Sequence, residues 1–290
     1  MLAQRGLCQA DFVVSGLPWA AFTENQRRDV LSSVVAALSP HGVFTYHVMK
    51  GEQMAHRKPT IVLVHGAFAD GSGFTAIVKR LVADGYPVVV APNPLRGLSS
   101  DAEQLKALLN GIDGSIVLVG HSYGGAVISS AATGNPEVKA LVYLAAFVPE
   151  TGESVQELVE KFPGSTVGES LKPVPLPGGQ VDLYIDPRVF HPHFAGDLPA
   201  EEAALFAITQ RPATGAALGE PAAGPQAWHT IPSYNLISGA DRIIPPAAQE
   251  FMARRSGATI EVVEGASHLV FVSSPGPALA LIAKAATENA

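Results

Sequence analysis

The most restrictive feature of this sequence is a strand-like run that turns sharply into a helix at a serine. Residues 116–119 (IVLV) are branched and apolar, which favours an inner strand of a parallel sheet. They lead into GHSYGG at residues 120–125, where glycines around Ser122 allow a cramped turn that holds the serine hydroxyl clear of the backbone. Such a nucleophile elbow is strained, and strain of this kind usually serves a function. A serine that only caps a helix is the alternative, and the rest of the chain has to distinguish the two.

Strand-like runs alternate with helical segments on both sides of this elbow. The expected strands cover residues 60–64, 86–90, 116–119, 140–144, 233–240 and 260–263, and the expected helices include 73–84, 101–110 and 122–133. This alternation predicts an α/β fold with a mostly parallel central sheet and helices on both faces. The regularity stops near residue 148, and prolines and glycines become frequent. We therefore expect one α/β domain over residues 58–290 with a small helical cap inserted at about 149–231.

A serine hydroxyl is a poor nucleophile until an imidazole accepts its proton, so a base and an acid should follow Ser122. His268 comes after the expected strand at 260–263 through a short turn, whereas His229 lies just before a strand. Asp241 lies directly past the end of the 233–240 strand, at the edge where open α/β sheets gather their active sites. Its alternative roles are a helix cap or a partner of Arg242. Ser122, His268 and Asp241 are the candidate catalytic residues.

Other acids after Ser122 fit less well. Asp182, Asp186 and Asp197 all lie in the proline-rich stretch, which has no strand pattern. Glu264 is the fallback acid, but it is too near His268 in sequence to be a comfortable orienting group.

The negative charge that develops on a carbonyl oxygen during acyl transfer needs two backbone N–H donors. Tyr123, the residue after the serine, supplies one, and the loop after the 60–64 strand should supply the other. In that loop, HGAF at residues 65–68, the amide of Ala67 is the candidate, with Phe68 beside it. His65 is better interpreted as fixing this loop by hydrogen bonds than as a base.

The expected cap should build the substrate pocket. Its large aromatic residues Phe190, Phe194, Phe206 and Trp228 are candidate substrate contacts, although each is also explained by packing within the cap. The pair His191 and His193 has no acidic or sulfur ligand near it in sequence, so we predict no metal site. No cofactor motif accompanies the elbow, and we predict none.

Composition limits the partners. The chain has 290 residues, 47% hydrophobic and 16% charged, a formal net charge of −7 and a single cysteine, Cys8. The absence of a basic cluster argues against nucleic acid or an anionic membrane as a partner. No apolar run is long enough for a membrane span and the amino terminus is a poor signal peptide, so we expect a cytoplasmic protein. A small neutral ligand fits this charge, and the sequence is compatible with a homodimer.

With these residues in place, the chain resembles the α/β-hydrolases over roughly residues 58–288. Within that superfamily it is similar to bacterial esterases related to plant methylesterases and hydroxynitrile lyases, in which spans like LVYLAAFVP at residues 141–149 precede a small cap. Hydroxynitrile lyases of this group carry a lysine directly after the catalytic histidine and a threonine in the early loop. Here Leu269 and Ala67 take those positions, which favours hydrolysis, and Leu269 becomes a candidate substrate contact.

The resemblance implies a serine hydrolase that cleaves a small carboxylic ester through an acyl-enzyme intermediate. One alternative uses the same triad for carbon–carbon bond cleavage, as a hydroxynitrile-lyase-like enzyme or a C–C bond hydrolase. Another is a small-ligand receptor without turnover on the same fold, because fold alone does not fix function.

Residues 1–57 form an extension before the expected hydrolase domain. The pattern predicts a strand at 11–19, an amphipathic helix at 25–38 and a strand at 42–48. This order resembles the middle of a SAM-dependent methyltransferase, where a stretch similar to SGLPW at residues 15–19 follows a strand near the cofactor. The glycine-rich cofactor loop is missing, and a fragment of about 50 residues is too small for a large core of its own. We therefore predict no methyltransferase activity.

Overall fold

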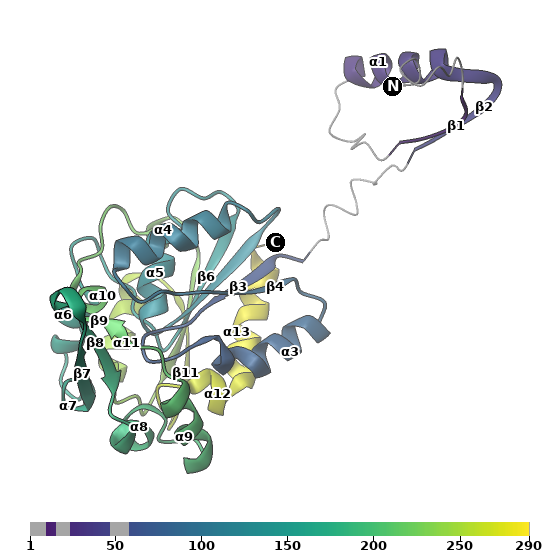
Figure 1. Ribbon diagram of the computed structural model, residues 1–290. Coiled ribbons are helices and arrows are strands. Elements are labelled where there is room, and N and C mark those ends of the chain that lie inside the picture. The colour runs from purple at the N-terminus through teal and green to yellow at the C-terminus, as the bar shows by residue number, and fades with distance from the viewer. Residues whose placement is uncertain (1–9, 16–23, 47–57, 290) are drawn as a thin grey trace. The chain divides into compact units, whose positions relative to one another are not determined.

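The computed structural model describes residues 10–15, 24–46 and 58–289 (Figure 1). The chain divides into two compact units, Met1–Arg57 and Lys58–Ala290. In the smaller unit, strand β1 (Ala10–Ser15) pairs in parallel with β2 (Leu38–Tyr46), and helix α1 (Glu24–Ala37) connects them. The carboxyl end of the first strand predicted from sequence, residues 16–19, lies outside the described residues.

A six-stranded sheet forms the centre of the larger unit, and its neighbouring strands all pair in parallel. Its strands are β3 (Thr60–Val64), β4 (Val88–Ala91), β5 (Ile116–His121), β6 (Val138–Leu144), β10 (Ser233–Ser238) and β11 (Thr259–Val263). They lie in the order β11-β10-β6-β5-β3-β4. The inner strand β5 is buried along its whole length, as its branched apolar residues require. The predicted, mostly parallel α/β fold is confirmed.

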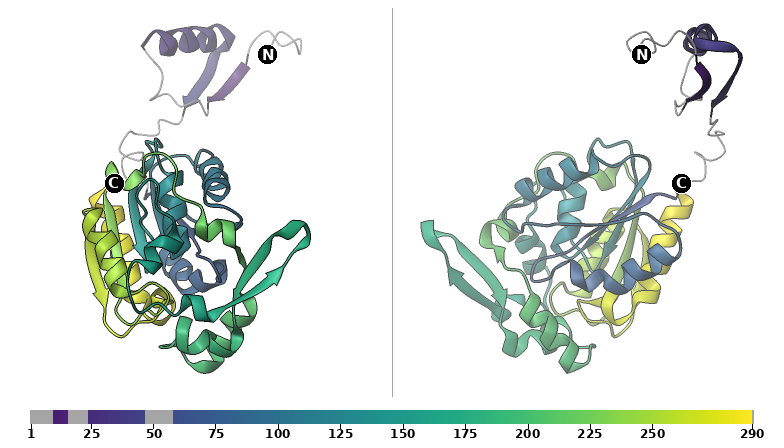
Figure 2. Two further views of the ribbon diagram at one scale, coloured as in Figure 1. Left: turned by 90° about the vertical axis from the view of Figure 1, so that its left-hand side faces the viewer. Right: turned by 45° about the vertical axis from the view of Figure 1, so that its right-hand side comes forward.

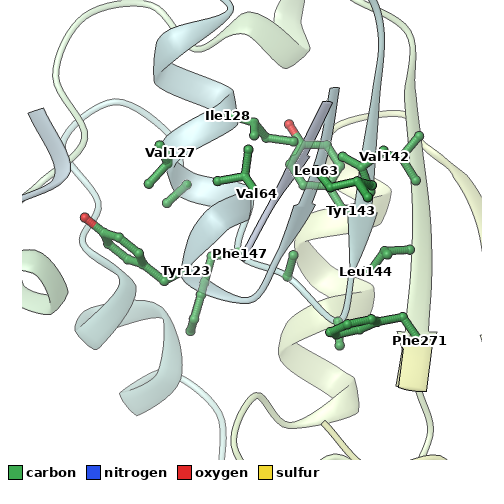
Figure 3. Close-up of a cluster of buried hydrophobic side chains, with 14 of the residues drawn as sticks. Leu63, Val64, Tyr123, Val127, Ile128, Val142, Tyr143, Leu144, Phe147 and Phe271 are labelled. Carbon is green, nitrogen blue, oxygen red and sulfur yellow. The ribbon is translucent and has the colours of Figure 1, made fainter. Parts of the chain in front are cut away.

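Helices cover both faces of this sheet (Figures 1 and 2). The carboxyl-terminal helix α13 (Pro275–Glu288) packs against α3 (Thr75–Ala83) and strands β6 and β10, and α4 (Leu98–Leu109) packs against α5 (Tyr123–Ala131) on the other side. Helix α11 (Pro246–Arg255) packs against β10. Figure 3 shows side chains of β3, β6 and α5 that form part of the core. Helix α4 begins earlier than the sequence predicted, directly after Gly97.

The cap between β6 and β10 is not purely helical. Its helices are α6 (Val155–Glu160), α7 (Val167–Ser170), α8 (Pro187–Phe194), α9 (Ala200–Thr209) and α10 (Gly215–Gly219). It also contains an antiparallel sheet of β7 (Leu171–Pro175), β8 (Val181–Ile185) and β9 (Ala213–Thr214), and the β7–β8 hairpin projects from the unit in Figure 2. Strand β7 was not predicted from sequence because it contains Pro173 and Pro175. Proline is rare inside strands and occurs mainly at the edges of sheets. In the described ranges, no helix is long and apolar enough to cross a membrane.

Candidate active site

The turn at Ser122 has the strained geometry of a nucleophile elbow. Ser122 joins β5 to α5 with φ 53° and ψ −125°, a conformation that non-glycine residues rarely adopt. The approach of the early loop is equally tight, because a Cβ on Gly66 would lie 2.5 Å from the Cβ of Ser122. A Cβ on Gly124 would lie 2.5 Å from the carbonyl oxygen of Val64. Glycine is therefore required where β3 and the elbow meet.

The two candidate oxyanion donors come from neighbouring strands. β3 and β5 pair directly, so the loop with Ala67 and the start of α5 with Tyr123 lie at the same edge of the sheet. Among the hydrogen bonds of the described residues, the amides of Ala67 and Tyr123 donate none. Tyr123 begins its helix, where amide groups have no partner within the helix. Both residues line the same cavity as Ser122, so their amides are the candidate donors to a ligand there.

The candidate acid and the candidate base also follow neighbouring strands, β10 and β11. The His268 Nδ1–H group donates to Asp241 Oδ2 at 2.7 Å, and both side chains are completely buried. The pairing fixes the tautomer, which leaves Nε2 as the proton acceptor of the ring. The structure thus brings Asp241 and His268 together as the sequence predicted.

Other groups hold the Asp241 carboxylate in place. Its Oδ1 accepts hydrogen bonds from the amides of Ile243 at 2.8 Å and Ile244 at 3.0 Å. The Gln249 amide group donates to Oδ2 at 2.8 Å, and its Oε1 accepts from the Ser238 amide at 3.1 Å. Sequence reasoning missed Gln249, a fully buried polar residue on α11. Its only sequence signal was a polar residue three positions after Pro246, where the helix begins.

His121 packs behind the base. Its Nε2–H donates to the carbonyl oxygen of His268 at 3.1 Å, and the two rings lie 4.7 Å apart. Phe194 of the cap contacts the other side of the His268 ring, edge to face at 4.8 Å. The His268 Nε2 atom is buried without a hydrogen-bond partner among the described residues, so it makes no hydrogen bond with Ser122 Oγ. A buried imidazole nitrogen without a hydrogen-bond partner is able to accept a hydroxyl proton.

Two further histidines at the site are held neutral by burial. Burial lowers the pKa of His121 well below its usual value, and the neighbouring His268 lowers it further. Burial also lowers the pKa of His65, whose Nδ1–H donates to the Gly66 carbonyl at 3.0 Å. Their hydrogen bonds fix the loops that carry Ala67 and His268.

Ser122 opens into a largely apolar cavity of about 460 Å³ between the sheet edge and the cap. Besides the residues already named, its apolar lining consists of Phe147, Val155, Val159, Phe162, Pro163, Val167, Leu171, Leu183, Leu218 and Ile243. Glu160 is its one charged lining residue in the part of the chain that the structure describes. Of the predicted substrate contacts, Phe68 lines this cavity.

The other predicted contacts lie elsewhere. Phe190, Phe194, Phe206 and Leu269 surround a second hollow of only about 10 Å³, with room for about one water molecule. Trp228 lines neither space, and its indole N–H donates to the Pro149 carbonyl at 2.9 Å. The cap's aromatic residues therefore mostly pack, and aliphatic residues from α6 to β8 shape the main cavity.

The remaining candidates have structural partners. Asp182 pairs with Arg96, Asp186 caps α8, Asp197 accepts from Ser267, and Glu264 is exposed. His191 lies 2.9 Å from the Leu198 carbonyl, His193 lies 2.7 Å from Ser170 Oγ, and His229 pairs with Glu150. Across the described ranges, no group of three or more histidine, cysteine or acidic side chains is placed to hold a metal ion.

Comparison with known proteins agrees with this geometry. A model of the alpha/beta hydrolase family matches residues 61–280. The chain belongs to this family. This α/β-hydrolase is 30% identical to a pyrethroid hydrolase of Sphingobium wenxiniae, over 74% of the chain and 83% of that protein. It is 24% identical to Methylesterase 1 of Arabidopsis thaliana, over 68% of the chain and 83% of that protein. The crystal structure of polyneuridine aldehyde esterase, 17% identical, superposes with a TM-score of 0.67 over 78% of this chain and 98% of that one, and shows the fold.

A short similarity of another kind accompanies the family match. The α/β-hydrolase shares 50% identity over 44 residues with an ornithine lipid N-methyltransferase of Singulisphaera acidiphila. This covers 15% of the chain and 23% of the methyltransferase. This short match agrees with the resemblance to a methyltransferase fragment, and the absence of methyltransferase activity stays a prediction.

Proposed function

We propose that this α/β-hydrolase cleaves carboxylic esters through an acyl-enzyme intermediate on Ser122. The observation that carries the proposal is the buried His268–Asp241 pair, which leaves Nε2 without a partner among the described residues. The strained Ser122, which lines an apolar cavity, supports it. The esterases and hydrolases among its relatives support the same reaction class.

In the proposed first half-reaction, Ser122 Oγ attacks the ester carbonyl carbon while its proton moves to His268 Nε2. The carbonyl oxygen becomes an oxyanion that accepts hydrogen bonds from the amides of Ala67 and Tyr123. Asp241 stabilises the imidazolium that forms. The bond to the alcohol oxygen then breaks, and His268 returns its proton to the departing alkoxide.

In the second half-reaction, water attacks the acyl-enzyme and His268 takes one proton from that water. The tetrahedral intermediate collapses, the carboxylic acid leaves, and the proton returns to Ser122 Oγ. In this proposal the amide donors belong to the folded backbone, and fixed donors of this kind need little reorganisation at the moment of reaction.

The cavity favours an uncharged ester with one large apolar group. Its volume of about 460 Å³ suits a drug-sized ligand, and its walls are mainly aliphatic and aromatic. Anionic substrates are disfavoured because Glu160 lies in the lining and the chain carries a net charge of −7.

The test is the initial hydrolysis rate on nitrophenyl esters from acetate to decanoate, compared between wild type and Ser122→Ala. We expect kcat/KM to fall by about 10⁴-fold or more in the variant and to peak at an intermediate or long acyl chain in the wild type. Ser130→Ala is the matched control, because Ser130 lies on the same helix and its hydroxyl contacts Gln226, away from the cavity.

Unchanged hydrolysis in Ser122→Ala would refute the serine mechanism. Equal binding of a nonhydrolysable ester analogue by both proteins, with no turnover by wild type, would favour a receptor instead.

A further inference from the structure

The hydroxyl of Tyr123 makes a contact that the proposed chemistry does not use. Tyr123 Oη donates to Asp101 Oδ2 at 2.8 Å, and both side chains are almost completely buried. Figure 3 shows the Tyr123 hydroxyl directed away from the strand side chains of the core. Tyr123, whose backbone amide is a candidate oxyanion donor, is therefore also held by its side-chain hydroxyl.

Asp101 is a buried carboxylate in the first turn of α4. Burial raises the pKa of the Asp101 carboxyl group above its usual value. Hydrogen bonds from Tyr123 and from the backbone of Arg96 and Gly97 act in the opposite direction and offset part of that rise. The Arg96 amide lies 3.2 Å from each of its two oxygens. A carboxylate is costly to bury unless such donors surround it, so the arrangement is specific.

Arg96 extends this anchor into the cap. Its guanidinium bonds Asp182 Oδ1 of β8 at 2.6 Å and the Pro212 carbonyl at 2.8 Å. In return, the Thr214 hydroxyl donates to the Arg96 carbonyl at 2.8 Å. Cap residues 211–214, which we call the cap bracket, are thus tied to the Tyr123 anchor.

The cap bracket also contacts the loop that carries Ala67, the other candidate oxyanion donor. The amide of Phe68, directly after Ala67, donates to the Arg211 carbonyl at 3.1 Å. Phe68 has φ 60°, a strained value that such a tie helps to maintain. Both halves of the predicted oxyanion hole are therefore hydrogen-bonded, directly or through Asp101 and Arg96, to one short cap segment.

We propose that Asp101 is a positioning residue for the oxyanion hole, holding Tyr123 and, through Arg96, joining its amide to the cap bracket. The inference rests on the proposed function, since it concerns the same serine mechanism. Hydrogen bonds to an oxyanion are directional, and a small misplacement of a donor costs transition-state stabilisation more than substrate binding.

Tyr123→Phe is the most specific test, because it deletes only the hydroxyl that contacts Asp101. We expect kcat to fall about tenfold with KM changed less than about twofold. Tyr143→Phe is the matched control: Tyr143 is an equally buried tyrosine whose hydroxyl lies 2.9 Å from Ser129 Oγ. Its kcat should match wild type, even if its melting temperature falls as much as that of Tyr123→Phe.

Two more variants separate positioning from general destabilisation. Asp101→Asn keeps an acceptor for the hydroxyl and should retain more activity than Asp101→Ala. Arg96→Ala keeps the backbone donor to Asp101 and the backbone carbonyl that accepts from Thr214, but it loses the guanidinium contacts with Asp182 and Pro212. We expect a kcat loss of about threefold. For each variant, the inhibition constant of a trifluoromethyl ketone, which mimics the tetrahedral intermediate, should rise in proportion to the loss in kcat/KM.

The inference is overturned if Tyr123→Phe and Asp101→Ala follow Tyr143→Phe in kcat and inhibitor affinity while Ser122→Ala is inactive. If Ser122→Ala keeps wild-type activity, the proposed function itself fails, and the two failures are distinguished.

Discussion

The carboxyl edge of the sheet and the cap contribute to the site in different ways. At the sheet edge, Ser122 follows β5 directly, and Asp241 and His268 follow β10 and β11 through short turns. Several hydrogen bonds hold Asp241 and His268 in place. In the cap, side chains from α6 to β8 line the cavity mainly through apolar contact. Under the proposed function, the sheet edge supplies the reacting groups and the cap determines which ester fits. Substitutions at the edge should therefore change rate on every ester, and those in the cap should change which ester is preferred.

The largest effect that tests this division is expected at Asp241. Asp241→Asn should lower kcat by about 10³- to 10⁴-fold on all chain lengths, because the amide favours the wrong tautomer of His268. Glu264→Gln, which removes the exposed fallback acid, should change kcat less than about twofold. Initial rates on the nitrophenyl series measure both. A large loss at Glu264 and a small one at Asp241 would reverse the assignment of the acid.

A smaller but general loss is expected from crowding the elbow. Gly66→Ala places a Cβ 2.5 Å from the Cβ of Ser122, so the serine or the early loop must shift. We expect kcat to fall about 100-fold on every ester. Gly276→Ala, at an exposed helical position with nothing within 4 Å, is the control and should leave kcat unchanged. Equal rates for the two variants would show that the elbow is looser than its geometry indicates.

A selective effect is expected in the cap. Leu183→Trp narrows the cavity and should lower kcat/KM on decanoate about tenfold while changing that on acetate less than about twofold. Leu205→Trp makes the same change on α9, where Leu205 is 64% exposed and outside the cavity lining, and should preserve the profile. A uniform loss on all esters after Leu183→Trp would contradict the division between rate and selectivity.

The smallest effect concerns stability against pH. His121 and His65 have lowered pKa values in the folded chain, mainly from burial. As pH falls through about 6.5, the unfolded chain therefore binds protons that the folded chain does not, and the free energy of unfolding decreases. The slope is at most about 1.4 kcal/mol per pH unit for each histidine.

We expect His121→Gln to reduce the change in the free energy of unfolding between about pH 7.5 and 5.5, measured by urea denaturation. These pH values lie about one unit above and below the usual histidine pKa. The raised pKa of Asp101 affects stability in the opposite direction, because the stabilisation from its protonation is lost as pH rises above 3.8. This contribution is the same in wild type and in His121→Gln, so it does not alter the comparison. An unchanged slope would show that His121 does not titrate differently on unfolding.

The sequence predicted the sheet edge better than the cap for a physical reason. The serine turn, the acid and the base each follow a strand whose apolar run is visible locally, so Ser122, Asp241 and His268 could be named without coordinates. Gln249 could not, because its role depends on α11 folding back onto the Asp241 loop.

In the cap, hydrophobicity alone indicated large aromatic residues as pocket walls. The structure packs Phe190 against Phe194 and places Trp228 by Pro149, while smaller residues such as Leu183 and Val159 line the cavity. Tertiary packing decides which apolar side chain faces a cavity. In the cap this packing includes the pairing of β7 with β8, which the two prolines of β7 concealed in the sequence.

The central claim is that Ser122 is the nucleophile, and the most direct measurement is a map of covalent attachment. The protein is treated with an alkyl fluorophosphonate and analysed by intact mass and peptide sequencing. The account predicts a single adduct on Ser122, absent in Ser122→Ala and formed far more slowly in Asp241→Asn. Attachment at another residue, or ester hydrolysis that persists without any adduct on Ser122, would contradict it.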